Sequence, residues 1–309
     1  MSTPTTKKSD RSPWFKLIWI VPIVLVAGAI IVLAANAFRG SAAGTSFLKT
    51  YPGHSELPSN APVGFPAWLE WQHFLSAFFI LLIIRTGLQI RTTRRPPAYW
   101  TRRNTGVLKT KGQPVRISLS VWFHLTLDIL WILNGALFYV LIFVTGQWVR
   151  LIPIHWDVFP NAISAGIQYA SLNWPTEDGW TNYNALQLVT YFITVFIAAP
   201  LAILTGVRMV PGLAIRFKKI DKIYPVTVAR KIHFPVMIYF AAFTVVHVTL
   251  VLATGALRNL NHMYGGSDNV NWIGFGIFAG SVVLMAAAWI AVRPTILSSM
   301  ASLTGNVRR

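Results

Sequence analysis

Two histidines, His233 and His247, lie fourteen positions apart within one apolar stretch of helix length. An α-helix rises about 1.5 Å and turns about 100° per residue, so this step moves roughly 21 Å along the axis and ends close to the same face. An uncharged imidazole with a free ring nitrogen is a side chain that ligates the iron of a b-type haem. The spacing therefore predicts one axial ligand for each of two haems stacked across a membrane.

The elements that must position these ligands are membrane spans. The chain is 54% hydrophobic and only 12% charged over its 309 residues, a balance typical of a polytopic membrane protein. Six stretches reach the roughly 20 apolar residues that cross a hydrocarbon core, and lipid leaves helix as their only form. The fold class that we predict is therefore all-α integral membrane, with six transmembrane helices. The predicted spans are Leu17–Ala37, Ala67–Ile90, Ile117–Val144, Leu186–Val207, Ile232–Thr254 and Trp272–Val292.

The net charge of +18 is unevenly distributed along the chain. The N-terminal tail, the 91–116 and 208–231 loops and the C-terminal tail hold 22 lysines and arginines, whereas the three alternate segments hold four. The positive-inside rule then places both termini in the cytoplasm. We interpret the basic charge as a topology signal with some attraction to anionic membrane lipid, and we expect no nucleic-acid partner.

Two further histidines inside spans, His73 and His124, predict the second ligand of each iron. Given this topology, His73 lies roughly 9 Å below the outer edge, near the depth of His247. His124 lies near the cytoplasmic edge, close to the depth of His233. We therefore expect an outer haem between His73 and His247 and an inner haem between His124 and His233.

Three ionisable residues accompany these histidines. Arg85 lies in the inner half of the second span, where a charge is costly and marks a functional candidate; its partner is either a propionate of the inner haem or Asp128. Asp128 follows His124 by one turn and could orient that imidazole, pair with Arg85 or pass protons to a bound quinone. Glu70, three residues before His73, is either a proton port beside the outer haem or a group that faces water.

The composition restricts how a cofactor can be held. Cysteine is absent, which excludes disulfides, thiolate-ligated clusters or haem, and covalent haem attachment through C-x-x-C-H. Any redox centre must therefore use histidine, methionine or carboxylate ligands. Small residues near the histidines give space for a flat ring, although helix packing uses the same residue types. They are Ala77, Gly87, Gly135, Gly206, Ala241 and Ala242.

The first span resembles a secretory signal, because it has a basic lead and an Ala-Asn-Ala at 35–37. Its apolar stretch is longer than the 7 to 15 residues usual for a cleaved signal, so we predict an uncleaved anchor. The remaining histidines, His54, His155 and His262, fall in outer loops, where we expect them to face solvent or to pack.

The 145–185 loop on the outer side is long for a helical bundle. It predicts a surface helix that either lies on the bilayer, or serves as a docking lid for an external partner or as a wall of a quinone pocket. The apolar positions expected on one face of this helix are Ile163, Ile167, Tyr169, Ala170 and Trp174.

The ligand pattern resembles the bacterial membrane cytochrome b family, which includes the cytochrome b subunits of nickel–iron hydrogenases, formate dehydrogenases and thiosulfate reductases and bacterial cytochrome b561-like proteins. The similar features are Trp-Gln-His73-Phe, Trp-Phe-His124-Leu, a third core helix without histidine, and a fourth with His233-Phe-Pro and Val-Val-His247-Val. The resemblance covers residues 67–255. It implies a central four-helix dihaem bundle that holds two non-covalent, bis-His haem b groups through these four ligands.

This resemblance implies three parts of the chain. Residues 1–66 comprise a cytoplasmic tail, the N-terminal anchor and an outer segment. Residues 67–255 form the four-helix cytochrome b core with the long 145–185 loop. Residues 256–309 comprise an outer turn, the sixth transmembrane helix and a cytoplasmic tail.

The resemblance also implies electron transfer between the quinone pool and a peripheral redox subunit, so the chain would be an electron-transfer subunit of a membrane oxidoreductase complex. Here the additional first and sixth spans make the core begin on the outer side, so the partner's side does not follow from the family. The long outer loop favours an extracytoplasmic partner, such as a molybdopterin oxidoreductase.

Two alternatives lack haem. One is an ion- or proton-coupled transporter with an intramembrane histidine and aspartate relay, which calls for broken helices and internal repeats around a midplane site. Pro200 and Pro235 are present, but no repeat is evident and the histidines avoid the midplane. The other is a membrane anchor subunit in which the histidines only pack. Visible absorption distinguishes either from a cytochrome.

Overall fold

The structure is a computed structural model that describes residues 14–105, 109, 112–174, 179–213 and 218–309. The basic tail up to residue 13 and residues 175–178 of the predicted outer loop lie outside the described residues. The chain divides into two compact units. Unit 1 contains the described residues of 1–56, 155–177 and 184–187, and unit 2 contains those of 57–154, 178–183 and 188–309.

Six helices in the described part of the chain are long and apolar enough to cross a membrane, which confirms the predicted all-α integral membrane class. Most extend beyond the predicted spans, because hydropathy detects only the part that lies in hydrocarbon while the helix continues into the polar interface. The fifth span, for example, begins six residues before the predicted Ile232. The spans are α1 (Trp14–Gly40), α3 (Ala67–Thr92), α4 (Leu119–Val144), the continuous α6 (Ala185–Phe192), η2 (Ile193–Ala198) and α7 (Ala199–Met209), α10 (Val226–Ala253) and α12 (Ile273–Ala291).

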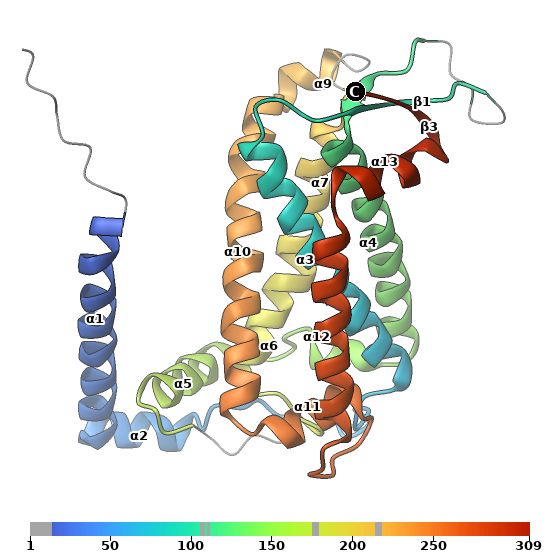
Figure 1. Ribbon diagram of the computed structural model, residues 1–309. Coiled ribbons are helices and arrows are strands. Elements are labelled where there is room, and N and C mark those ends of the chain that lie inside the picture. The colour runs from blue at the N-terminus through green and yellow to red at the C-terminus, as the bar shows by residue number, and fades with distance from the viewer. Residues whose placement is uncertain (1–13, 106–108, 110–111, 175–178, 214–217) are drawn as a thin grey trace, which may run out of the picture. The chain divides into compact units, whose positions relative to one another are not determined.

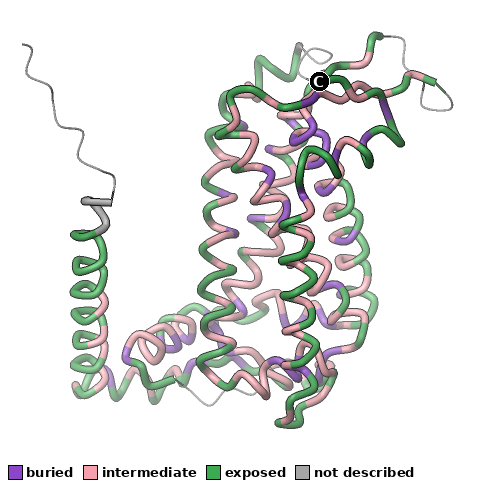
Figure 2. The backbone as a smooth tube through the Cα atoms, viewed as in Figure 1, coloured by how far each residue is buried: buried purple, intermediate pink, exposed green. Residues whose placement is uncertain are grey.

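Local sequence sets where the spans of unit 2 begin. The extended residues Pro66 and Pro225 immediately precede α3 and α10. Ser118 caps α4, since its hydroxyl accepts a hydrogen bond from the Val121 amide at 3.3 Å. Within unit 2, α3 packs against α4, α7 packs against α10, and α12 packs against α3 (Figure 1). Few residues on these helices are fully buried (Figure 2), as expected where lipid covers the outward faces.

The fourth span contains a wide π-helical turn, η2, ahead of Pro200. The carbonyl oxygen of Val195 in this turn accepts a hydrogen bond from the Tyr139 hydroxyl of α4 at 2.6 Å. The neighbouring Thr194 hydroxyl lies 2.7 Å from the Tyr239 hydroxyl of α10. The irregular turn thus joins this span to both neighbouring helices without interrupting it.

One end of unit 2 carries a small antiparallel sheet that hydropathy does not predict. Its strands are β1 (Tyr99–Arg102), β2 (Arg116–Ser118) and β3 (Gly305–Arg308), in the order β2-β1-β3. The helices α9 (Lys218–Ile223) and α13 (Pro294–Ser302) lie at the same end (Figure 1). We call it the basic end, because the 91–116, 208–231 and C-terminal segments that meet there are rich in lysine and arginine.

The opposite end of unit 2, the loop end, contains η1 (Gln147–Arg150) and α11 (Ala256–Tyr264). Arg150 is buried there and donates hydrogen bonds to the carbonyl oxygens of Gly64 (2.9 Å) and Gly179 (2.5 Å). Its guanidinium also lies 4.7 Å from the ring centre of Phe65. Gly64 has a φ of +79°, and a Cβ there would lie 2.6 Å from the Trp180 ring, so only glycine fits this turn.

Unit 1 contains α1, α2 (Ala42–Thr50) and α5 (Val158–Ala170). The helix predicted in the outer loop is confirmed as α5, and Ile163 on its predicted apolar face is 60% exposed, as a helix that lies on a surface allows. The residues of α5 that are buried are Val158, Asn161, Ser164 and Ala165. The side-chain oxygen of Asn161 accepts a hydrogen bond from the Gly53 amide at 3.0 Å, which explains why a polar residue faces inward.

Candidate functional site

The four intramembrane histidines lie on three helices of unit 2. His73 is on α3, His124 is on α4, and both His233 and His247 are on α10, whereas α7 has none. His124 and His233 lie toward the basic end of their helices, and His73 and His247 lie toward the loop end. The structure therefore places His124 and His233 toward one end of unit 2, and His73 and His247 toward the other.

His73 and His247 face each other, with ring centres 6.2 Å apart and ring planes at 61°. Aromatic rings surround the pair: Phe243 stacks on His247 at 5.4 Å, Tyr191 meets the same ring edge-on at 6.0 Å, and Tyr264 lies 5.9 Å from His73. The Nδ1 atom of His73 is buried and has no hydrogen-bond partner in the described part of the chain. The pair is thus an enclosed site with unsatisfied ring nitrogen.

The distance between these rings permits a test of fit to a haem iron. Two imidazoles that bind opposite sides of one metal through bonds of about 2 Å have ring centres roughly 6 Å apart. The separation of His73 and His247 matches this value, and the two ligands come from different helices, as bis-His ligation across a flat ring requires. The residues present fit haem b.

His124 and His233 share a second arrangement. The Nδ1 atom of His124 lies 2.8 Å from the Thr86 hydroxyl of α3, and the Nδ1 atom of His233 lies 2.8 Å from the Thr205 hydroxyl of α7. Each link joins one packed helix pair, α3 to α4 and α7 to α10. The two imidazoles are close enough to each other to interact electrostatically.

A glycine follows each of these threonines. A Cβ on Gly87 would lie 3.4 Å from Cε1 of His124, and a Cβ on Gly206 would lie 3.6 Å from Cε1 of His233. Sequence analysis identified the glycines as small residues but missed the threonines. The signal that could have revealed them is the Thr-Gly pair, which occurs near the basic end of both α3 and α7.

Arg85 lies against α12 in the structure. Its Nη2 donates a hydrogen bond to the carbonyl oxygen of Val292 at 2.9 Å, and its guanidinium lies 5.2 Å from the ring centre of Trp289. No ion pair joins Arg85 to Asp128 among the described residues; an Asp128 carboxylate oxygen instead lies 3.8 Å from Nε2 of His124. Of the two predicted partners of Arg85, Asp128 is therefore not the one that the structure brings to it.

Glu70 lies at the loop end, where its Oε1 is 2.8 Å from the position that a Cβ on Gly266 would occupy. Gly266 has a φ of +57° and belongs to the turn that follows α11. Tyr264, at the end of α11, contacts His73. The chain from Tyr264 to Gly266 therefore lies beside both the His73 ring and the Glu70 carboxylate. This placement is compatible with either predicted role of Glu70.

The other histidines have the roles expected of them. His54 and His155 are exposed. His262 is buried, its Nε2 lies 2.6 Å from a carboxylate oxygen of Asp268, and it packs on Trp180. Hydrogen bonds from Arg258, and then from His262, lower the pKa of Asp268 to about 2. This cluster holds the turn after α11 in place.

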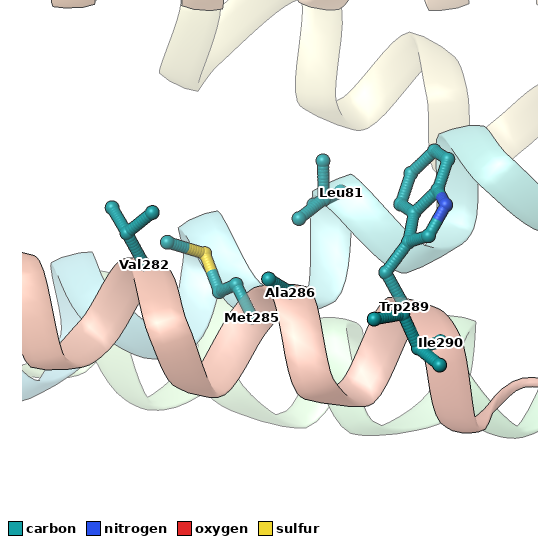
Figure 3. Close-up of a pocket in the computed structure, with 6 residues that line it drawn as sticks. All are labelled: Leu81, Val282, Met285, Ala286, Trp289 and Ile290. Atoms are coloured by element: carbon teal, nitrogen blue, oxygen red, sulfur yellow. The ribbon is translucent and has the colours of Figure 1, made fainter.

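A wholly apolar groove of about 410 Å³ lies between α3 and α12. Leu81 of α3 faces the α12 side chains across it (Figure 3). It contains no group that could ligate iron or exchange a proton, so it is separate from the histidine sites and suits a hydrocarbon chain of the surrounding lipid. The lining residues are Leu81, Val282, Met285, Ala286, Trp289 and Ile290.

The spans and the paired histidines define a membrane protein built to hold haem between helices. Residues 64–266 match the family model described as prokaryotic cytochrome b561, and the chain belongs to this family. The protein is accordingly a multi-pass membrane cytochrome b that functions in haem-dependent electron transfer. The matched segment contains all four histidines and ends before α12. No curated protein and no solved structure matches the chain.

Proposed function

We propose that this chain is a membrane-embedded dihaem cytochrome b that transfers electrons between the quinone pool and a partner oxidoreductase. The observation that carries the proposal is the 6.2 Å separation of the His73 and His247 rings, contributed by α3 and α10. In the proposal, His73 and His247 ligate one haem b, and His124 and His233 ligate the other. Each bound iron supplies reversible one-electron chemistry.

The protein residues hold the two sites apart and keep them dry. Helix α10 contributes one ligand to each site, and the fourteen-residue step separates these ligands by roughly 21 Å. Phe243 lies between them in sequence and stacks on His247, and Tyr191 closes the side of the same ring. Low polarity around a haem restricts solvent access and so influences its potential.

We propose that the basic end faces the cytoplasm, as the positive-inside rule requires for its lysines and arginines. Both termini are then cytoplasmic, His124 and His233 lie in the inner half of the membrane, and His73 and His247 lie in the outer half. The direction of the chain through residues 67–255 follows from the same assignment, since α3 then enters from outside.

The acidic residues support a division of roles between the two ends. Asp128, 3.8 Å from Nε2 of His124, is positioned to accept or donate a proton when a quinone is reduced or a quinol oxidised beside the inner site. We assign the redox partner to the outer side, which Glu70 at the loop end of unit 2 then faces, and the length of the 145–185 loop favours the same side. An extracytoplasmic molybdopterin oxidoreductase is the partner class that we favour.

The experiment is haem quantitation on the purified chain after haem-sufficient expression, by reduced-minus-oxidised and pyridine haemochrome spectra. We expect two b-type haems per chain. Either His73→Ala or His247→Ala should remove one haem, and the double variant should remove no more than that one. The exposed His155→Ala serves as a control that should retain both.

Combining variants from different pairs tests the assignment of ligands. His73→Ala with His124→Ala should remove both haems, whereas His124→Ala with His233→Ala should remove only the inner one. A haem-free wild-type protein would refute the proposal and favour the transporter or the anchor subunit. Loss of both haems in the His73→Ala, His247→Ala double variant would show that the ligands pair differently.

A further inference from the structure

We infer that Thr86 and Thr205 are positioning residues that fix the tautomers of His124 and His233, so that both imidazoles present Nε2 to one iron. The hydrogen bonds between these threonines and histidines then lower the reduction potential of the haem that the histidines hold. The inference rests on the proposed function, because it concerns the inner haem site. It assigns a role to two hydroxyls that no ligand pattern identifies.

The tautomer follows from hydrogen-bond accounting at each threonine. The Thr86 hydroxyl lies 2.8 Å from the Leu82 carbonyl oxygen and 2.8 Å from Nδ1 of His124. The Ile83 carbonyl oxygen also lies 3.0 Å from this hydroxyl. Carbonyl oxygens can only accept, so we assign the single hydroxyl proton of Thr86 to one of these two carbonyls, as is usual for a threonine inside a helix. The Thr86 oxygen is then an acceptor toward His124, and the imidazole must carry its proton on Nδ1.

The same accounting holds independently on the other helix pair. The Thr205 hydroxyl lies 2.7 Å from the Leu201 carbonyl oxygen and 2.8 Å from Nδ1 of His233. Donation to the Leu201 carbonyl again leaves the Thr205 oxygen as an acceptor from His233. Both imidazoles therefore have a proton on Nδ1 and a lone pair on Nε2, which is the atom available to a metal.

The glycines after the threonines lie beside the same two rings. Gly87 and Gly206 adjoin Cε1, the carbon between Nδ1 and Nε2, and a Cβ at either position would make ordinary van der Waals contact with the ring. The orienting groups are therefore the threonine hydroxyls, and the glycines leave space next to each imidazole.

The outer pair lacks this arrangement on one ligand. Nδ1 of His73 is buried without a hydrogen-bond partner in the described part of the chain. An imidazole that donates from Nδ1 is a more basic ligand than one that does not, and a more basic ligand favours ferric over ferrous iron. The threonines should therefore lower the potential of the inner haem specifically.

The test is potentiometric titration of the inner haem alone, in a His73→Ala background that lacks the outer haem. Thr86→Val and Thr205→Val keep side-chain shape and remove the acceptor. We expect the midpoint potential to rise in each, with about a tenfold change in the ferric-to-ferrous ratio at fixed potential, or about 59 mV for one electron. Thr249→Val, whose exposed hydroxyl bonds only the Val245 carbonyl, is the matched control and should leave the potential unchanged.

The serine variants Thr86→Ser and Thr205→Ser retain the hydroxyl and should retain the wild-type potential. If a valine variant loses the haem while its serine counterpart keeps the haem and potential, the hydroxyl is the required group and the inference holds. Unchanged potentials in both valine variants, or loss of haem in the serine variants, overturn it. These outcomes are distinct from failure of the proposed function, which would leave even the His73→Ala background without haem.

Discussion

The position of Arg85 against α12 leads to a quantitative prediction. Its guanidinium donates a hydrogen bond to the Val292 carbonyl, which follows the last turn of α12, where the helix dipole favours a positive charge. A hydrogen bond to a charged group contributes about 1.5–3 kcal/mol, and a cation over an aromatic ring, here Trp289, about 0.5–1 kcal/mol. The two contacts share one side chain and do not add fully. We expect Arg85→Gln to cost about 2–3 kcal/mol of unfolding free energy.

This cost is measurable as thermal stability in detergent. One kcal/mol corresponds to about 2–4 °C for chains of a few hundred residues, so the apparent unfolding midpoint of Arg85→Gln should fall by roughly 4–12 °C. Haem content, measured in parallel, should stay at the wild-type level. Arg293→Gln is the comparison variant: exposed Arg293 donates a hydrogen bond to the Ile290 carbonyl of the same helix end at 3.1 Å, and water can replace that bond, so its loss should cost less than about 1 kcal/mol.

The opposite pattern would refute this reasoning. If Arg85→Gln unfolds at the same temperature as Arg293→Gln but loses the inner haem, Arg85 is the partner of a haem propionate, as the sequence also allows. Lys at the same position separates charge from geometry, because a lysine retains the charge but lacks the planar fork that reaches both Val292 and Trp289.

Three further predictions concern other parts of the molecule. Gly305→Ala places a Cβ against the Trp100 ring and should release β3, at a cost of about 1–3 kcal/mol, seen as faster amide exchange at the C-terminus; Gly40→Ala, in open space, should not. The bonded Asp268 has a pKa of about 2, below its usual value, so its contribution to the free energy of unfolding is complete above about pH 4 and is lost as the pH falls toward 2. The difference in stability between the wild type and Asp268→Asn should therefore shrink between pH 4 and pH 2 and stay constant from pH 5 to 8. Protein expressed without haem should unfold at a lower temperature than the haem-loaded protein, since a ligand at a hundred times its Kd stabilises by about 2.7 kcal/mol; equal midpoints would argue against a haem that binds only the folded state.

The spans and the depth grouping of the histidines could be predicted because both depend on local properties. Hydropathy over twenty residues locates a span, and the pitch of one helix fixes the relation of His233 to His247. Depth then indicates which histidine of α10 lies at the level of His73 and which at the level of His124. The ends of the helices were less predictable, because α10 continues into a basic segment that hydropathy excludes.

The sheet at the basic end could not be predicted for the opposite reason. β1 pairs with β3, which lies about two hundred residues later, and neither strand has a hydrophobic pattern of its own. The partner of Arg85 depends on the same kind of distant contact, since the end of α12 lies equally far along the chain. The sequence suggested Asp128 as a partner of Arg85, whereas the hydrogen bond from Arg85 to the Val292 carbonyl can be found only in the folded structure.

The threonines show how little residue type alone reveals within a membrane. Thr249 and Thr205 both bond a carbonyl four residues earlier, and in sequence they look alike. They differ because α7 packs against α10 and sets Thr205 opposite His233, whereas Thr249 is exposed. What distinguishes a ligand-orienting hydroxyl from an ordinary one is therefore the packing of helix pairs.

The repetition of this device also bears on the choice between electron transfer and transport. A transporter would place its repeated elements around a site at the midplane. Here the repeated Thr-Gly and histidine links lie toward the basic end, and they join α3 to α4 and α7 to α10 in the same way. Each helix pair holds one imidazole by its Nδ1, and this contact restricts rotation of the ring that carries Nε2. A fixed pair of ligands suits an iron that changes only its charge, whereas a transport site must open and close.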